Sequence, residues 1–120
     1  MLEQSNTAEK IVQKQLDAYN QRNLADFLSL YTADIKIYNF GEEVPFIDGL
    51  QDLENIYNTV FEQSPNLHAV IKNRIVFDNK VIDQEEVSGR MGMDKVIVVV
   101  IYEVEYNLIS KVTFIRKRPI

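Results

Sequence analysis

The sequence predicts an α+β fold in which three N-terminal helices pack on a strongly curved, mostly antiparallel sheet. Apolar residues recur at helical spacing in the first half of the chain, whereas runs of β-branched and aromatic residues separated by turn signals fill the second half. The successive hairpins of the second half predict an antiparallel meander. The 120 residues fit one domain with its own core, expected to span residues 1–120.

The first two helices are predicted from caps and apolar stripes. Asn6 is a suitable N-cap with Glu9 at the capping-box position, and the helix is expected to end between Asn20 and Asn23. Its apolar stripe is Ala8, Ile11, Val12, Leu16 and Tyr19. Asn23 can cap a second, shorter helix with Asp26 in its first turn. The stripe of that helix is Leu24, Phe27, Leu28 and Tyr31.

The middle of the chain predicts one strand and the third helix. Residues 34–40 have a β-branched and aromatic pattern, and the following GEEVPF is typical of a loop. Asp48 and Gln51 form a second capping-box pair. The helix that they open would end at Ser64 to Asn66, and its buried side would carry Leu53, Ile56, Tyr57, Val60 and Phe61.

Four strands are predicted in the remainder, at residues 68–77, 81–88, 95–106 and 108–116. Asp78-Asn79, the segment 89–94 and Asn107 supply the three turns between them. The run from Val96 to Val104 is apolar on both faces, so neither face is expected to meet water. One face can cover the helices, and the other requires a partner.

Composition excludes several functional classes. With 13 basic and 18 acidic residues the net charge is -5, which disfavours binding to nucleic acid or to an anionic membrane. The one basic cluster, Arg116 to Arg118, is interpreted as a solvated tail. No apolar run is long enough to span a bilayer, and the start of the sequence lacks the features of a secretory signal. Because cysteine is absent, we expect the protein to be located in the reducing cytoplasm.

The order of these elements resembles that of the nuclear transport factor 2-like superfamily, which includes ketosteroid isomerases and SnoaL-like polyketide cyclases. The segment IVQKQLDAYNQRNLADFLSLYTADIKIYNF is similar to the opening of the family, with an apolar helix followed by Asn-x-x-Asn-Leu and Phe-Leu-x-Leu-Tyr-x-x-Asp. The resemblance continues through VIDQEEVSG and IYEVEYNLISKVTFIR, and covers residues 8–117.

This resemblance implies a cystatin-like, cone-shaped half-barrel with an apolar cavity between the helices and the concave face of the sheet. It also implies a homodimer through the outer face of the sheet. Its implications for function are broader, because the superfamily contains isomerases, dehydratases, cyclases and modules without catalysis.

The residues that would indicate isomerase chemistry are replaced. Ketosteroid isomerases use a carboxylate base with a Tyr and a protonated Asp that polarise the substrate carbonyl. An ungapped alignment of the opening segment places Asn39 at the base position and Gln15 at the tyrosine position, and Tyr102 falls at the position of the second acid. Because an amide cannot act as a general base, chemistry of this type is not expected.

The third predicted strand of the chain carries the candidate catalytic residues Asp83 and Glu85. Strand alternation places them on one face, and the family register, aligned at Gly89, turns that face inward. Two partly desolvated acids would repel each other, and at least one pKa would rise toward the range suited to proton transfer. In the opposite register both carboxylates would lie at the rim or in solvent.

Other polar and aromatic residues are candidates for ligand contact. His68 starts a strand and could pair with a cavity acid, or could be a structural surface residue. Four tyrosines on inward stripes suggest a mostly apolar cavity with a few hydroxyl donors: Tyr19, Tyr31, Tyr57 and Tyr102. Phe46 could close its mouth. One histidine among scattered acids predicts no metal site, and no cofactor is expected.

Two functional hypotheses therefore remain open. The first is a SnoaL-like enzyme or binding protein for a small, mostly apolar organic molecule, in which Asp83 or Glu85 transfers a proton. The second is a non-catalytic dimerisation or protein-interaction module whose cavity is filled by its own side chains. Carboxylates inside an open cavity would favour the first, and a cavity packed solid would favour the second.

Overall fold

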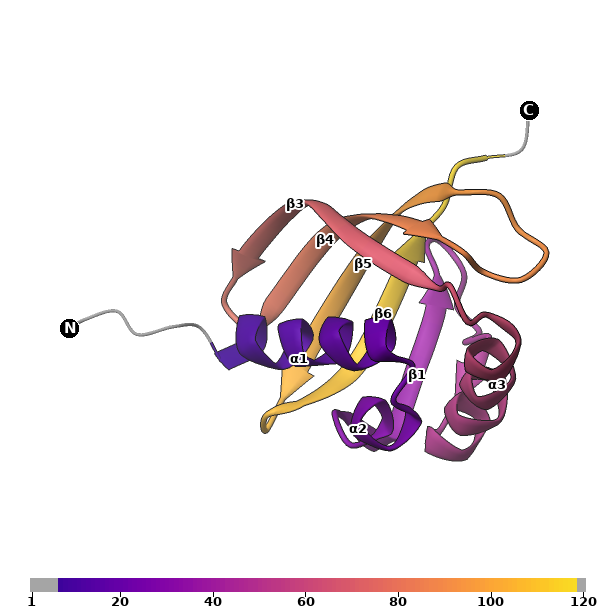
Figure 1. Ribbon diagram of the computed structural model, residues 1–120. Helices are drawn as coiled ribbons and strands as arrows, with labels where there is room; N and C mark the ends of the chain where they lie inside the picture. The colour runs from indigo at the N-terminus through magenta and orange to yellow at the C-terminus, as the bar shows by residue number, and fades with distance from the viewer. Residues whose placement is uncertain (1–6, 119–120) are drawn as a thin grey trace.

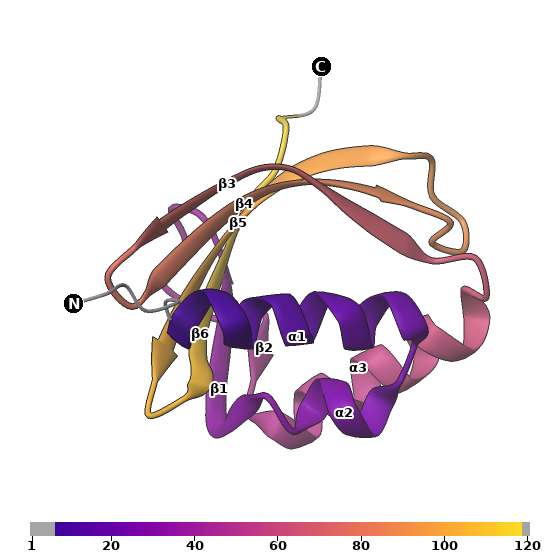
Figure 2. The same cartoon turned by 60° about the vertical axis from the view of Figure 1, so that its left-hand side comes forward.

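The computed structural model describes residues 7–118, and the helices of this part of the chain lie on one side of a curved sheet (Figure 1). The turned view shows the strands arching over the helices (Figure 2). The elements are α1 (Thr7–Gln21), α2 (Leu24–Leu28), β1 (Tyr31–Asn39), β2 (Ile47–Asp48), α3 (Leu50–Gln63), β3 (His68–Phe77), β4 (Lys80–Ser88), β5 (Val96–Glu105) and β6 (Leu108–Ile115). The predicted fold class is confirmed.

The sheet has the strand order β2-β1-β6-β5-β4-β3. Strands β3 to β6 form the predicted antiparallel meander, in which each strand pairs with the next along the chain. β1 pairs in parallel with β6, with Ile37 opposite Val112, so the sheet is mixed. β2 is a two-residue strand that the sequence did not predict, and it adds to the free edge of β1 through Lys36 and Ile37.

The first helix pair follows its predicted pattern closely. α1 buries Ala8, Val12, Gln15 and Ala18 on one face. Asn23 caps α2, because its side-chain oxygen accepts a hydrogen bond of 3.1 Å from the backbone N–H of Asp26. Tyr31, expected on the stripe of α2, is instead the first residue of β1. The predicted cap at Asn6 lies outside the described residues.

The capping box predicted for α3 is wrong. Gly49 is the N-cap, with φ of +96°, and Asp48 belongs to β2, where it pairs with Lys36. The N–H of Asp48 donates to a carboxylate oxygen of Asp52 at 3.0 Å. The backbone of Asp48 therefore belongs to the edge strand of the sheet. Asp52, in the first turn of α3, accepts the hydrogen bond from the residue before the N-cap.

An aromatic cluster joins the helices to one another beneath the sheet. Phe27 of α2 lies at its centre, with ring centroids 4.9 Å from Tyr57, 5.0 Å from Tyr31 and 5.5 Å from Phe61. Tyr19 of α1 packs edge-on against Phe61, with centroids 5.8 Å apart. The rings come from α1, α2, β1 and α3, so this cluster fixes the distance between the helices and holds three tyrosine hydroxyls near one another.

The two faces of β5 differ in exposure. Val98, Val100, Tyr102 and Val104 are buried against the helices, whereas Ile97, Val99 and Ile101 on the opposite face are half-buried. The outer face also carries exposed apolar side chains from β3, namely Val70, Ile75 and Phe77. One apolar face of the long strand thus covers the helices, and the other is partly open in the single chain.

The end of β4 is pressed against the loop between α3 and β3. Gly89 has φ of +78°, and a Cβ at this position would lie 2.0 Å from the backbone oxygen of Asn66. Only glycine fits both the left-handed conformation and this contact. The β4–β5 loop therefore starts from a fixed point beside the helices.

None of the helices in residues 7–118 is long and apolar enough to cross a membrane.

Candidate functional site

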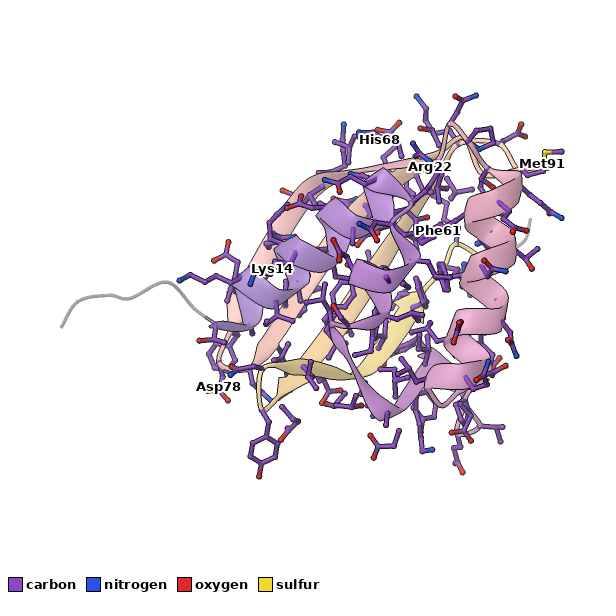
Figure 3. The ribbon with its side chains drawn as sticks, turned by 60° about the horizontal axis from the view of Figure 1, so that its bottom comes forward. Lys14, Arg22, Phe61, His68, Asp78 and Met91 are labelled. Atoms are coloured by element: carbon purple, nitrogen blue, oxygen red, sulfur yellow. The ribbon has the colours of Figure 1, made fainter. Side chains whose placement is uncertain are left out.

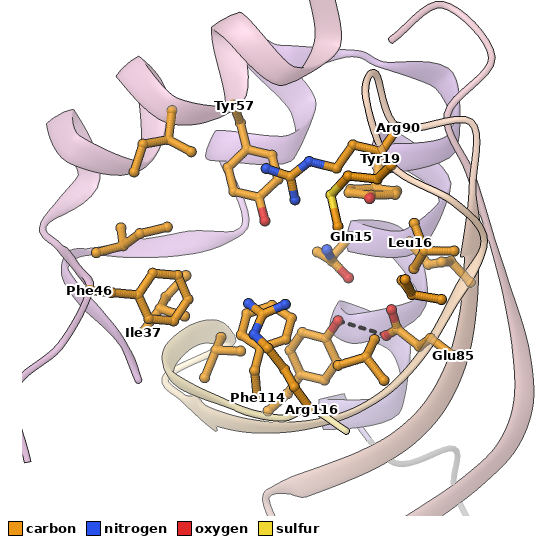
Figure 4. A pocket seen from close by; sticks show the side chains of 18 of the residues that line it. Gln15, Leu16, Tyr19, Ile37, Phe46, Tyr57, Glu85, Arg90, Phe114 and Arg116 are labelled. Carbon is orange, nitrogen blue, oxygen red and sulfur yellow. Dashed lines mark hydrogen bonds between the residues drawn. The ribbon is translucent and has the colours of Figure 1, made fainter. Parts of the chain in front are cut away.

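A cavity of about 270 Å³ lies between the concave face of the sheet and the helices (Figure 4). Its walls come from α1, β1, α3 and strands β4 to β6, and its rim from the β4–β5 loop and the segment after β6. The lining residues are Gln15, Leu16, Tyr19, Tyr31, Ile37, Phe46, Ile47, Ile56, Tyr57, Glu85, Val87, Arg90, Met93, Asp94, Val96, Val98, Tyr102, Val112, Phe114 and Arg116. The cavity is not filled by its own tyrosines and Phe46.

Glu85 is the buried acid of this cavity. Strand alternation turns it inward from β4, and only 7% of its surface is exposed. Tyr102, on the neighbouring β5, donates a hydrogen bond from its hydroxyl to a Glu85 carboxylate oxygen at 3.0 Å (Figure 4). Burial raises the pKa of Glu85 to about 7, although the bond from Tyr102 acts in the opposite direction. The carboxyl group is therefore able to gain and lose a proton near neutral pH.

Asp83 shares the inward face of β4 but has different surroundings. It is 1% exposed and lies outside the residues that line the cavity. Arg74 of β3 binds both of its oxygens, from Nε at 2.7 Å and from Nη2 at 2.9 Å. The remaining Nη1 of Arg74 donates to the side-chain oxygen of Gln13 on α1 at 2.8 Å. Asp83 is thus held in a closed ion pair beneath α1, which leaves Glu85 as the carboxyl group available to a ligand.

The four candidate tyrosines all line the cavity. Burial raises the pKa values of Tyr19, Tyr31, Tyr57 and Tyr102, so their hydroxyls stay protonated and can donate hydrogen bonds. Gln15 also lines the cavity, close enough to hydrogen-bond with the side chain of Tyr31. These groups give a mostly apolar cavity several uncharged polar contacts.

The remaining candidates divide between the mouth of the cavity and the surface. Phe46 lies at the mouth, 40% exposed. Asn39 is half-buried and does not line the cavity, and its side-chain oxygen accepts a hydrogen bond from Nε of Arg116 at 3.1 Å. His68 is exposed at the start of β3 and lies at the periphery of the molecule (Figure 3). His68 cannot pair with the cavity acid from this position.

Sequence reasoning missed the charged residues at the mouth. Arg116 to Arg118 are exposed, as expected of a solvated tail, but the guanidinium of Arg116 also stacks on Phe114 at 4.7 Å from the ring centroid and lies 5.8 Å from that of Phe46. Arg90 and Asp94 reach the cavity from the β4–β5 loop. The alternation of β6, which turns Phe114 inward, was the one signal that could have placed Arg116 beside it.

The residues that the structure describes contain no group of three or more histidine, cysteine, aspartate or glutamate side chains that could hold a metal ion. A carboxyl group with a pKa near neutrality, in an apolar cavity with hydroxyl donors, can act as a general acid or a general base.

Several solved structures share this fold. A cystatin-fold protein from Novosphingobium aromaticivorans has 23% identity and a TM-score of 0.83, covering 94% of this chain and 100% of its own. A candidate ketosteroid isomerase from Kribbella flavida has 18% identity and a TM-score of 0.78, with coverages of 95% and 80%. A candidate polyketide cyclase from Sinorhizobium meliloti has 14% identity and a TM-score of 0.73, with coverages of 92% and 99%.

Sequence comparison identifies the family. No curated protein matches the chain. The family model of the SnoaL-like domain matches residues 12–112, from the middle of α1 into β6. This range includes Glu85, Tyr102 and most of the cavity wall. The arrangement of helices and curved sheet around a cavity agrees with this match. The chain therefore belongs to the SnoaL-like family.

Proposed function

We propose that this protein binds a small, mostly apolar organic molecule in its cavity and that Glu85 exchanges a proton with it. The observation that carries the proposal is the burial of Glu85 in an open cavity, with its pKa near 7 and its carboxylate oriented by Tyr102. The family and its structural relatives support a small-molecule-binding fold. A volume of about 270 Å³ lies just below the usual range of ligand pockets, which favours a small ligand.

The geometry supports different roles for the carboxyl group and the hydroxyl groups of the cavity. Below about pH 7 Glu85 is protonated and can act as a general acid, and above it the carboxylate can act as a general base. The hydroxyls of Tyr31 and Tyr57 line the same cavity and could donate to a carbonyl oxygen of the ligand. The proton-transfer group would thus belong to β4, since Asn39 of β1 has no titratable proton.

An isotope-exchange experiment tests the proposal. Wild-type protein in D₂O at about pH 8 is expected to accelerate deuterium incorporation next to the carbonyl of a neutral ketone such as α-tetralone, followed by NMR. Glu85→Gln should lose the acceleration, by roughly a hundredfold or more if Glu85 is the base. Glu86→Gln is the matched control, because Glu86 lies on the opposite face of β4 and pairs with Lys72 and Lys95.

Binding is measured separately from exchange. A ligand that binds only the native state raises its melting temperature, so neutral cyclic ketones are screened by thermal shift. Binding without exchange would leave a binding protein and remove the catalytic part of the proposal. If no small, mostly apolar organic compound binds, whether neutral or acidic, and none is exchanged, the proposal as a whole is wrong.

We also propose that a second copy of the chain covers the outer face of the sheet. The half-buried side chains of β5 and the exposed apolar side chains of β3 form one surface, which suits a self-complementary two-fold contact. Sedimentation velocity should give a dimer for the wild type and a monomer for Val99→Lys. Glu54→Lys, on an exposed position of α3, is the control and should leave the dimer intact. A monomeric wild type would refute this proposal.

A further inference from the structure

Two guanidinium groups line the cavity together with Glu85. Arg90 comes from the β4–β5 loop, and Arg116 follows β6 directly. Figure 4 shows both groups turned into the pocket, Arg90 on the side of Tyr57 and Arg116 on the side of Phe114. Two segments that are 26 positions apart in the sequence therefore bring permanent positive charges to one mouth.

Arg116 is held in place but retains free donors. Its Nε donates to Asn39, and its plane rests on the ring of Phe114. Within residues 7–118 its two terminal nitrogens make no hydrogen bond, and no carboxylate lies within ion-pair distance of them. A guanidinium that is oriented by stacking and has its terminal edge open is ready to bind an anion in two-point fashion.

The guanidinium of Arg90 also has all of its donors available within the described residues. Its side chain forms no ion pair or hydrogen bond with residues 7–118. Its charge lies close enough to Tyr19 and Tyr57 to lower their pKa values, against the larger effect of burial. Arg90 therefore projects its charge into the tyrosine-lined part of the cavity. Its half-buried position keeps it within reach of a ligand that enters from solvent.

The charge of the mouth contrasts with that of the whole chain. The net charge of the protein is -5, yet the charged residue types at the mouth of the cavity are two arginines and one aspartate, Asp94. Glu85, deeper inside, is neutral below about pH 7. The excess of positive charge would raise the local concentration of a small anion, although the protein as a whole repels it.

We propose that the ligand of this cavity is a small organic acid, with its carboxylate bound by Arg90 and Arg116 and its apolar body between the sheet and the tyrosines. This inference rests on the proposed function and narrows its ligand class. A planar carboxylate matches the fork of a guanidinium, and an apolar body matches the remaining walls. The carboxylate stays at the mouth, and the body extends toward Glu85.

A matched pair of probes tests the inference. Cinnamate and its uncharged amide, cinnamamide, have the same apolar body, and their affinities are compared by isothermal titration calorimetry at about pH 6, where Glu85 is protonated and the carboxyl group of cinnamate is ionised. Cinnamate is expected to bind at least tenfold more tightly, as a charge-assisted hydrogen bond implies. Arg90→Gln and Arg116→Gln should each remove most of this preference, while Arg116→Lys, which keeps the charge without the fork, should retain part of it.

Lys117→Gln is the control, because Lys117 carries the same charge next to Arg116 but does not line the cavity. It should leave both affinities unchanged, and circular dichroism checks that every variant is folded. Equal binding of acid and amide, or a preference that survives both arginine variants, would overturn the inference while the proposed function stands. Binding of neither probe would also overturn it, and the screen of neutral ketones then decides the proposed function on its own.

Discussion

Replacing Glu85 by Gln should change how the stability of the protein depends on pH. The pKa of Glu85 is raised from 4.5 to about 7 in the folded state, because burial disfavours the carboxylate. Between these values the folded protein holds a proton that the unfolded chain releases. Wild-type stability therefore declines as pH rises through this window and levels off above it. Gln has nearly the same shape, can accept the hydrogen bond from Tyr102, and does not ionise.

The magnitude follows from the size of the shift. Each unit of pKa difference corresponds to about 1.4 kcal/mol, so the free energy of unfolding of Glu85→Gln should gain about 3 kcal/mol on the wild type between pH 5 and pH 8. Urea unfolding followed by circular dichroism at several pH values measures this difference. Most of the change should fall between about pH 5 and pH 7.

Glu86→Gln provides the contrast in the same strand. Its pKa is lowered by hydrogen bonds with Lys95 and Lys72, so any stability that it contributes is present above its ordinary pKa and is lost only in acid. The difference between Glu86→Gln and the wild type should therefore be flat from pH 5 to pH 8. If the Glu85→Gln difference is equally flat, the assignment of Glu85 as a buried acid with a raised pKa is wrong.

Three further substitutions test the framework of the site by urea unfolding. Arg74→Met should cost about 3–5 kcal/mol, because it leaves the buried Asp83 carboxylate uncompensated; a loss below 1 kcal/mol would contradict the closed ion pair. Gly89→Ala should destabilise far more than Gly92→Ala, since both have a positive φ but only Gly89 would place a Cβ against neighbouring backbone; equal losses would refute the contact. Asn23→Ala should cost about 1 kcal/mol through loss of the α2 cap, and an unchanged midpoint would show that the cap is unimportant.

The meander and the helices could be predicted from the sequence because local signals agree with the tertiary structure there. β3 was predicted with its observed bounds, since its β-branched run lies between Pro65 and the turn at Asp78. β2 escaped prediction because two residues carry no periodicity. Tyr31 was assigned to the stripe of α2 because it follows Phe27 and Leu28 at helical spacing. It is buried from β1, on the same side of the sheet as that stripe.

The site was predicted only in part, for reasons that lie in the tertiary structure. Period-two alternation identifies Asp83 and Glu85 as a same-face pair but cannot tell which carboxylate meets the cavity. That distinction depends on Arg74 of the neighbouring strand and on α1, which covers the ion pair. Arg90 lies in a loop, whose direction no periodicity specifies. Arg116 lies in a basic cluster that is typical of a solvated tail.

The parallel pairing of β1 with β6 has a consequence for how the fold is assembled. β6 is the last strand within residues 7–118, yet it lies in the interior of the sheet, between β1 and β5. β1 therefore cannot pair with the meander until residues 108–115 are present and have closed a loop of roughly 70 residues. A chain truncated before β6 would lose the strand that joins β1 to β5, rather than a strand at the edge of the sheet. On a ribosome, the cavity would be completed only after almost every residue of this domain had emerged.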